Sequence, residues 1–266
     1  MPPLDEKGFL GKEIEKWILK IRGAHSDFFQ LADKVNQFCQ KQMFKLEAHN
    51  KDKQETLVAA LYIRVINTYQ AAILLAERGL MSQSKTLTRS MIESLFSLCA
   101  IAKSEKYADE FILEDQRNRL RYVNKYRKLH GGIPPEVSRA EIESLEKQLH
   151  EDIKEHEIKK KTTEQWSIDA GMHDWYLAVY SVLSDSVHSK VKDLERHLVV
   201  NNSNEIKEFQ WGPDDHDIEK ILMTLIQGML TGLKCTLSLF NQKRESEIAG
   251  FEEHLSKLVK ERLLNN

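Results

Sequence analysis

Proline and glycine are scarce in this chain, and this scarcity restricts its fold more than any other feature. The 266 residues include only 5 prolines and 11 glycines. Because these two residues punctuate turns, a chain with so few of them has few, long elements rather than many short strands. Hydrophobic residues make up 41% of the sequence, which is enough for a core. We therefore predict an all-α protein built as a multi-helix bundle.

Apolar residues recur at helical spacing through most of the chain. The segment 55–78 is apolar nearly all round, which is typical of a central helix surrounded by others. Gly79 fits the end of this helix and Ser82 the start of the next, so 55–78 and 82–103 form an antiparallel helical hairpin. The one β-like passage predicts a small β-hairpin near 197–211, where an Asn-rich turn separates two apolar runs.

We predict a single helical domain over 1–245 that carries a charged helical insertion at 136–162. The insertion helix has a narrow apolar line amid dense charge, which is typical of a protruding helix. Ser138 and Glu141 mark its start, because they have the spacing of a capping box. The final helix, 246–266, either docks on the core or pairs with a second copy. A homodimer would form through this helix or through the insertion helix.

The charge balance and the N-terminal residues indicate the compartment of the protein and the partners it can bind. The chain has 39 basic and 41 acidic residues, so affinity for nucleic acid or for a membrane must come from a local patch. The first residues include acids before any apolar run, unlike a secretory signal. The apolar run 57–76 contains Arg64, and 221–233 is shorter than the roughly 20 residues that span a bilayer. We expect a soluble, cytoplasmic protein with no membrane partner.

Cysteine and histidine spacing argues against a metal site. Cys39, Cys99 and Cys235 are odd in number and far apart, which favours reduced thiols in a cytosolic protein. The sequence has no His-x-x-x-His pair and no glycine-rich phosphate loop. We expect neither a metal nor a cofactor.

Two predicted helices carry polar residues at the margins of their apolar faces. Arg89 and Glu93 are four residues apart, and Tyr180, Ser184 and His188 form an i, i+4, i+8 ridge. Either pattern alone is common on helices, as an ion pair or as a half-buried histidine. If the two helices lie against each other, their polar margins enclose a common pocket.

A third signal is Arg64, which lies within an apolar run and needs a partner if it is buried. We predict Glu93 as that partner. Ser184 or Asp185 would orient His188. The candidate catalytic residues are Arg89, Glu93 and His188, and the pocket residues are Arg64, Tyr180, Ser184 and Asp185.

A basic stripe follows one face of the helix predicted over 105–129. No acid occurs between residues 116 and 130. A row of cations on a rigid helix suits a phosphate backbone, and Tyr122 and Tyr126 can stack on exposed bases. The alternative is a solvated face balanced by nearby acids. The residues predicted to bind RNA or a nucleotide are Arg117, Arg121, Lys125 and Lys128.

Taken together, these segments resemble a known family. Arg89-Ser-Met-Ile-Glu93 after an apolar helix and a glycine turn, the basic middle, and Tyr180-Ser-Val-Leu-Ser-Asp-Ser-Val-His188 are similar to the family called domain of unknown function 5677. The resemblance covers about residues 55–215 and implies an all-helical prokaryotic protein. By architecture the family is similar to the HEPN superfamily, many of whose members cleave RNA without a metal and serve in toxin–antitoxin or antiviral systems. Those enzymes place a histidine four to six residues after an arginine on one helix, a spacing that this sequence lacks.

Two functional hypotheses follow. In the first, the protein is a binding or signalling component of a prokaryotic stress or defence system and uses the polar pocket between two core helices. In the second, it is a metal-independent, HEPN-like ribonuclease or toxin. Arg89 would then bind a phosphate, Glu93 would position Arg89 or share in proton transfer, and His188 would act as general acid or base. The lack of a complete catalytic signature favours the first hypothesis.

Overall fold

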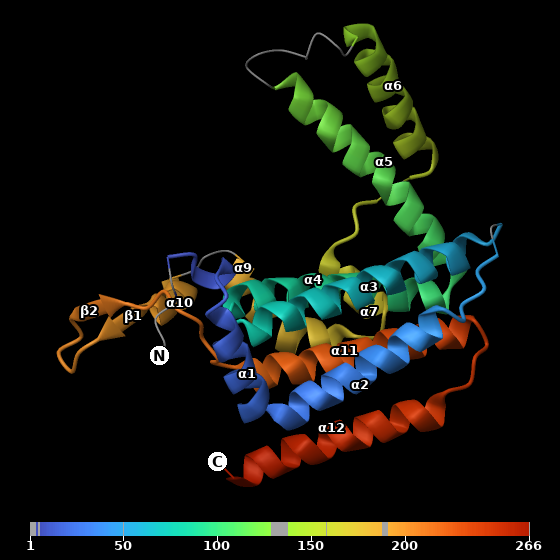
Figure 1. The fold of residues 1–266 in the computed structure, drawn as a ribbon. Coiled ribbons are helices and arrows are strands. Elements are labelled where there is room, and N and C mark those ends of the chain that lie inside the picture. The colour runs from blue at the N-terminus through green and yellow to red at the C-terminus, as the bar shows by residue number, and fades with distance from the viewer. Residues whose placement is uncertain are drawn as a thin grey trace.

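A computed structural model describes residues 4, 6–49, 51–128, 138–157, 159–187 and 191–265. It confirms the all-α prediction: the described chain is a bundle of helices with one small β-hairpin (Figure 1). In chain order the elements are η1 (Gly8–Leu10), α1 (Ile14–Ala24), α2 (Ser26–Met43), α3 (Lys53–Glu77), α4 (Met81–Lys103), α5 (Glu105–Arg127), α6 (Arg139–Glu155), α7 (Thr163–Asp169), α8 (His173–Trp175), η2 (Tyr176–Tyr180), α9 (Ser181–Val187), α10 (Val191–Leu194), η3 (Glu195–His197), β1 (Leu198–Val200), β2 (Ile206–Phe209), α11 (Ile218–Leu239) and α12 (Glu245–Asn265).

The hairpin of α3 and α4 forms the centre of the bundle (Figure 1). Its turn depends on Gly79, which has a φ of +74°, a region that favours glycine. A Cβ atom at Gly79 would also lie only 2.5 Å from the Cβ of Pro213, so a larger residue does not fit. The predicted glycine turn therefore has two physical reasons, the backbone angle and the close approach of the chain before α11.

Helix α11 packs against both helices of the central hairpin and against α2. Two glycines allow its close approach to α4. A Cβ atom at Gly228 would lie 2.7 Å from Met91 Cε, and one at Gly232 would lie 2.7 Å from Leu95 Cδ2. Helix α12 covers α2 and α11 on the outside (Figure 1), and its Ile248, Leu255 and Leu258 side chains are buried in the main core. The final helix thus docks on its own chain.

By length and composition, α3 and α11 are each apolar enough to cross a membrane. In the structure they lie within the bundle, where α3 packs against α4 and α11 packs against α2, α3 and α4. Many of their apolar side chains, such as Tyr62 and Leu225, are fully buried among protein atoms, although Ile63 and Leu74 of α3 are exposed. This arrangement is that of core helices.

Helices α5 and α6 project from the bundle as an antiparallel pair, which we call the arm (Figure 1). The base of α5 is anchored by Ala108, which is buried in the main core. Farther out, Val123, Ile142 and Leu149 form a small core of their own. The predicted insertion helix is shorter than expected, since it ends at Glu155, and Glu157 has a φ of +46°, which is incompatible with a continuing helix.

The predicted β-hairpin is present, and it is shorter than the segment 197–211. Strands β1 and β2 pair antiparallel, with Leu198 opposite Phe209 and an irregularity between Val199 and Val200. The hairpin extends from the side of the bundle (Figure 1). It connects the α9–α10 region to α11.

Candidate functional site

Helices α8, η2 and α9 follow one another without a break, and α9 lies against α4. The polar residues at the edges of the two apolar faces meet there. Arg89 of α4 donates from Nε to Ser184 Oγ over 3.0 Å and from Nη2 to the Tyr180 hydroxyl. The Tyr180 hydroxyl in turn donates to Glu93 Oε1 over 2.6 Å. Arg89 Nη1 and Glu93 Oε1 are 3.3 Å apart. The structure therefore brings together four of the predicted site residues, which we call the polar cluster: Arg89, Glu93, Tyr180 and Ser184.

A π-helical turn at Tyr176–Tyr180 precedes α9 and was not predicted. Its hydrogen bond runs from the backbone N–H of Ser181 to the carbonyl of Tyr176. A π-turn holds one residue more than an α-turn, so it changes which side chains face α4 beyond it. Such turns occur often at functional sites. Here the turn ends at Tyr180, the central residue of the polar cluster.

Rings from α8 and from this turn form a stack that ends at Arg89. The ring centroids of His173 and Tyr176 are 6.0 Å apart, and those of Tyr176 and Tyr180 are 5.3 Å apart. The Arg89 guanidinium lies 4.4 Å from the Tyr180 ring centroid, within the range of a cation–π contact. The stack and the hydrogen bonds together hold the guanidinium in one orientation.

The surroundings of Tyr180 keep its hydroxyl protonated, so that it donates a hydrogen bond. Burial, together with the neighbouring Glu93 carboxylate, raises the pKa of Tyr180 to about 12. Its hydroxyl therefore stays protonated at neutral pH and donates to Glu93. In the described chain the cluster is a closed network, suited to holding α9 on α4.

Arg64 does not join this cluster, and its predicted partner was wrong. Its side chain is exposed on the outer face of α3, and Nε donates to Ser94 Oγ over 3.2 Å rather than to Glu93. The reason is the register of α4, in which Ser94 faces α3 while Glu93 faces Tyr180. His188 lies outside the described residues, and so does the side chain of Asp185.

The predicted basic stripe lines a groove between the two helices of the arm. The groove has a volume of about 540 Å³, and His150 and Ile153 contribute to it from α6. No acidic residue occurs among the described residues that line it. Beside it, the Arg121 guanidinium lies 5.6 Å from the ring centroid of the exposed Tyr122. The structure thus brings all four predicted cations, Arg117, Arg121, Lys125 and Lys128, to one groove.

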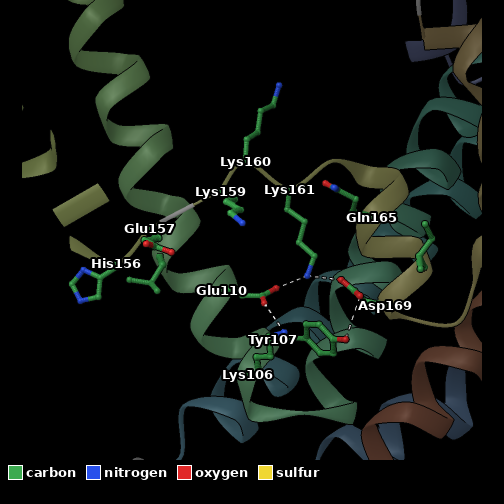
Figure 2. A pocket seen from close by; sticks show the side chains of 12 residues that line it. Lys106, Tyr107, Glu110, His156, Glu157, Lys159, Lys160, Lys161, Gln165 and Asp169 are labelled. Carbon is green, nitrogen blue, oxygen red and sulfur yellow. Dashed lines mark hydrogen bonds and ion pairs between the residues drawn. The ribbon is translucent and has the colours of Figure 1, made fainter. Parts of the chain in front are cut away.

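A second cavity of about 540 Å³ lies where the arm joins the bundle, and we call it the base cavity (Figure 2). Lys161 Nζ lies 2.5 Å from Glu110 Oε2 and 2.5 Å from Asp169 Oδ2. It also lies 3.9 Å from the Trp166 ring centroid. Burial opposes the charged form of Lys161, but the two carboxylates outweigh it and raise the pKa of this amine. Lys161 therefore remains a cation that ties α7 to α5.

Sequence reasoning missed the base cavity. The available signal was the lysine run 159–161, which we assigned to the end of the insertion helix. Because the helix ends at Glu155, these lysines lie instead on the connection to α7 and reach α5. In the described ranges, no three His, Cys, Asp or Glu side chains are close enough together to hold a metal ion.

A comparison with family models matches residues 55–206, more than half of the chain, to a family of unknown function, DUF5677. The chain belongs to the DUF5677 family. The DUF5677 match contains nearly all of α3 together with α4, the arm, the π-turn and α9, so it includes the polar cluster and both cavities of the arm. Comparison with curated proteins and with solved structures found no match.

Proposed function

We propose that this protein binds single-stranded RNA through the groove of the arm, and that it is a binding component rather than an enzyme. One observation carries the proposal: the four cations of the basic stripe line a single groove whose described lining has no acid. A cationic groove that follows a phosphate backbone is the general solution for binding single strands without reading their sequence.

The geometry of the groove favours a flexible single strand. Successive cations on α5 are three or four residues apart, which is about 4.5–6 Å along a helix. This repeat is comparable to the spacing of neighbouring phosphates in an extended strand. Tyr122 and Tyr126 are exposed on α5, and the Arg121 guanidinium of the groove lies 5.6 Å from the Tyr122 ring centroid, so unpaired bases that leave the groove can stack on these rings. Paired bases in a duplex offer no free face for such stacking.

In this proposal the polar cluster positions α9 on α4 and does not take part in chemistry. Each of the three guanidinium nitrogens of Arg89 has a partner within the chain. A phosphate would have to displace Tyr180 or Ser184 in order to reach the guanidinium. The closed network therefore supports a binding role.

A metal-independent, HEPN-like ribonuclease is the second candidate. It is supported by the π-turn beside Arg89 and by the ridge of Tyr180 and Ser184, which continues in the sequence to His188. Incubating labelled RNA with the protein in the presence of EDTA tests this candidate. Cleavage that is lost in His188→Ala, with unchanged thermal stability, would establish it and would overturn the purely binding role.

A test of RNA binding uses two matched double variants. Lys125→Glu/Lys128→Glu changes the groove, and Lys257→Glu/Lys260→Glu changes exposed lysines of the same spacing on α12. By fluorescence anisotropy we expect the groove variant to bind a single-stranded RNA at least about tenfold more weakly, with a shallower dependence on salt. The α12 variant should bind like the unaltered protein. Equal losses in both variants, or none in either, would contradict the proposal.

We also propose that the protein works in a prokaryotic stress or defence system, which is supported by the resemblance to the HEPN superfamily. Expression of the protein in a bacterial host, with and without phage challenge, measures this role. Protection or growth arrest that disappears in Lys125→Glu/Lys128→Glu would link the role to the groove. No effect of the unaltered protein on growth or phage yield would count against it.

A further inference from the structure

The groove and the base cavity lie on the same face of α5. From the base outward, the residues of α5 that line the two cavities include the series Lys106, Glu110, Leu113, Arg117, Arg121, Lys125 and Lys128, whose steps of three or four place them on one side of a helix. Lys106, Glu110 and Leu113 line the base cavity, and the basic stripe begins one turn later. From Lys106 to Lys128 the face is about 33 Å long. The two cavities therefore follow one another along the same face of the arm.

This face of the arm ends at the base cavity. Gln165, Ile168 and Asp169 of α7 bound the cavity on the bundle side, and residues 159–161 bound it on another. Figure 2 shows Lys161 reaching down between Glu110 and Asp169. A strand that lies in the groove with one end toward the bundle meets α7 there and cannot continue in the same direction. The cavity is thus placed to receive the end of a chain.

The charges of the base cavity fit an anion. Glu110 and Asp169 are matched by Lys161 and by Lys106, whose Nζ is 3.5 Å from Glu110 Oε1. Among the other charged residues that line the cavity, two lysines, Lys159 and Lys160, outnumber the single carboxylate of Glu157. Neither lysine forms an ion pair within the described part of the chain. Figure 2 shows Lys159 beside the open space and Lys160 extending from its rim.

His156 adds a further polar group to the same cavity. Its Nδ1 lies 3.0 Å from the Asp152 carbonyl oxygen, which accepts the hydrogen bond, so Nε2 is the nitrogen left for a ligand. The aromatic groups are less available, because Lys161 covers the Tyr107 ring at 4.5 Å and the Tyr107 hydroxyl donates to Asp169 over 3.2 Å. The cavity therefore suits a phosphate better than a stacked base.

We propose that the base cavity binds the terminal phosphate of a single-stranded RNA whose chain lies along the groove; this inference rests on the proposed RNA binding. A terminal phosphate monoester carries between about 1.5 and 2 negative charges at neutral pH. An internal diester carries one, so two lysines and a histidine distinguish the end of a strand from its interior. The cavity volume of about 540 Å³ also accommodates a group the size of a nucleotide.

The test measures affinity for one RNA sequence with an internal label and three kinds of end: a 5′-phosphate, a 3′-phosphate, or hydroxyl groups only. With the full-length protein we expect one phosphorylated form to bind at least fivefold more tightly than the hydroxyl form. In Lys159→Gln/Lys160→Gln this preference should disappear, while affinity for the hydroxyl form stays within twofold. Both lysines are exposed, so the thermal midpoint should not change. The Lys257→Gln/Lys260→Gln variant is the matched control and should keep the preference.

The outcomes separate this inference from the proposed function. RNA binding that depends on the groove but is equal for all three ends overturns the terminal-phosphate site and leaves the groove standing. A preference for phosphorylated ends that survives in Lys159→Gln/Lys160→Gln overturns the location of the site. No measurable binding of any RNA overturns both proposals.

Discussion

Arg89 and Ser184 are 95 residues apart in the sequence, yet Arg89 Nε donates to Ser184 Oγ over 3.0 Å. The same guanidinium also contacts Tyr180 and Glu93. A planar fork of donors can serve several acceptors at once, which the single ammonium of lysine cannot do. One side chain thus joins the middle of α4 to the helix that ends in α9.

Replacing Arg89 by lysine should weaken this connection. We expect Arg89→Lys to lower the free energy of unfolding by about 1–3 kcal/mol, because at least one partly buried partner loses its hydrogen bond. Denaturation in urea measures the loss. Arg119→Lys is the control, since Arg119 pairs with Asp115 four residues earlier on an exposed face and should change stability by less than about 0.5 kcal/mol. Equal effects of the two substitutions would show that the polar cluster adds no stability.

Removing the Tyr180 hydroxyl should have a separate cost. Tyr180→Phe keeps the ring stack with Tyr176 but leaves the Glu93 carboxylate without the hydroxyl donor. We expect a loss of about 1–2 kcal/mol in the free energy of unfolding, again from urea denaturation. Tyr126→Phe removes the hydroxyl of an exposed tyrosine and should be neutral. A neutral Tyr180→Phe would mean that water replaces the hydroxyl without loss.

The stabilising effect of Asp217 should depend on pH. Asp217 precedes α11, and although burial favours its neutral form, hydrogen bonds from Lys220 and Lys85 lower its pKa from 3.8 to about 2. A pKa that is lower in the folded state stabilises the protein above the unfolded pKa, and the stabilisation is lost as the pH falls to about 2. Asp217→Asn keeps a residue that tolerates the positive φ at this position.

We therefore expect Asp217→Asn to lower the free energy of unfolding by about 2 kcal/mol at pH 7. The difference between the two proteins should shrink between pH 4 and pH 2, as measured by urea denaturation across this range. A difference that stays constant with pH would place the effect in packing rather than in charge.

The three thiols should react in a fixed order. Burial raises the pKa of Cys39 to about 12, and contact with Cys235 together with burial raises the pKa of Cys99. The hydrogen bond from Cys99 lowers the pKa of Cys235, whose side chain is only partly buried. Because the thiolate is the reactive form, iodoacetamide should label Cys235 first, as peptide mass spectrometry over time would show. Fast labelling of Cys39 would contradict this order.

The periodicity of apolar residues was sufficient to predict the helices. In a bundle each helix buries one face, and this requires apolar residues three or four positions apart. The turn at Gly79 followed from local chemistry, since few other residues adopt its backbone angle. The meeting of Arg89 with Ser184 was anticipated from polar residues at the edges of two apolar faces. Such edges come together whenever the apolar faces beside them pack.

Features that depend on register or on non-local contacts were not predictable. Arg64 lies on an exposed side of α3, which a helix that is apolar nearly all round does not reveal. The π-turn at Tyr176–Tyr180 has no local signal in the sequence, and it places the Tyr180 hydroxyl between Arg89 and Glu93 of α4. The base cavity depends on where α6 ends, and helix ends are the part of a sequence-based assignment that is least certain.

The anchoring of α5 in the main core has a mechanical consequence. Ala108 is fixed in the core, and Lys128 lies about 30 Å farther along the same unbroken helix. A rigid rod held at one end acts as a lever, so a load applied near Lys128 is delivered as torque at Ala108. Small displacements at the far end would thus reach the bundle interior.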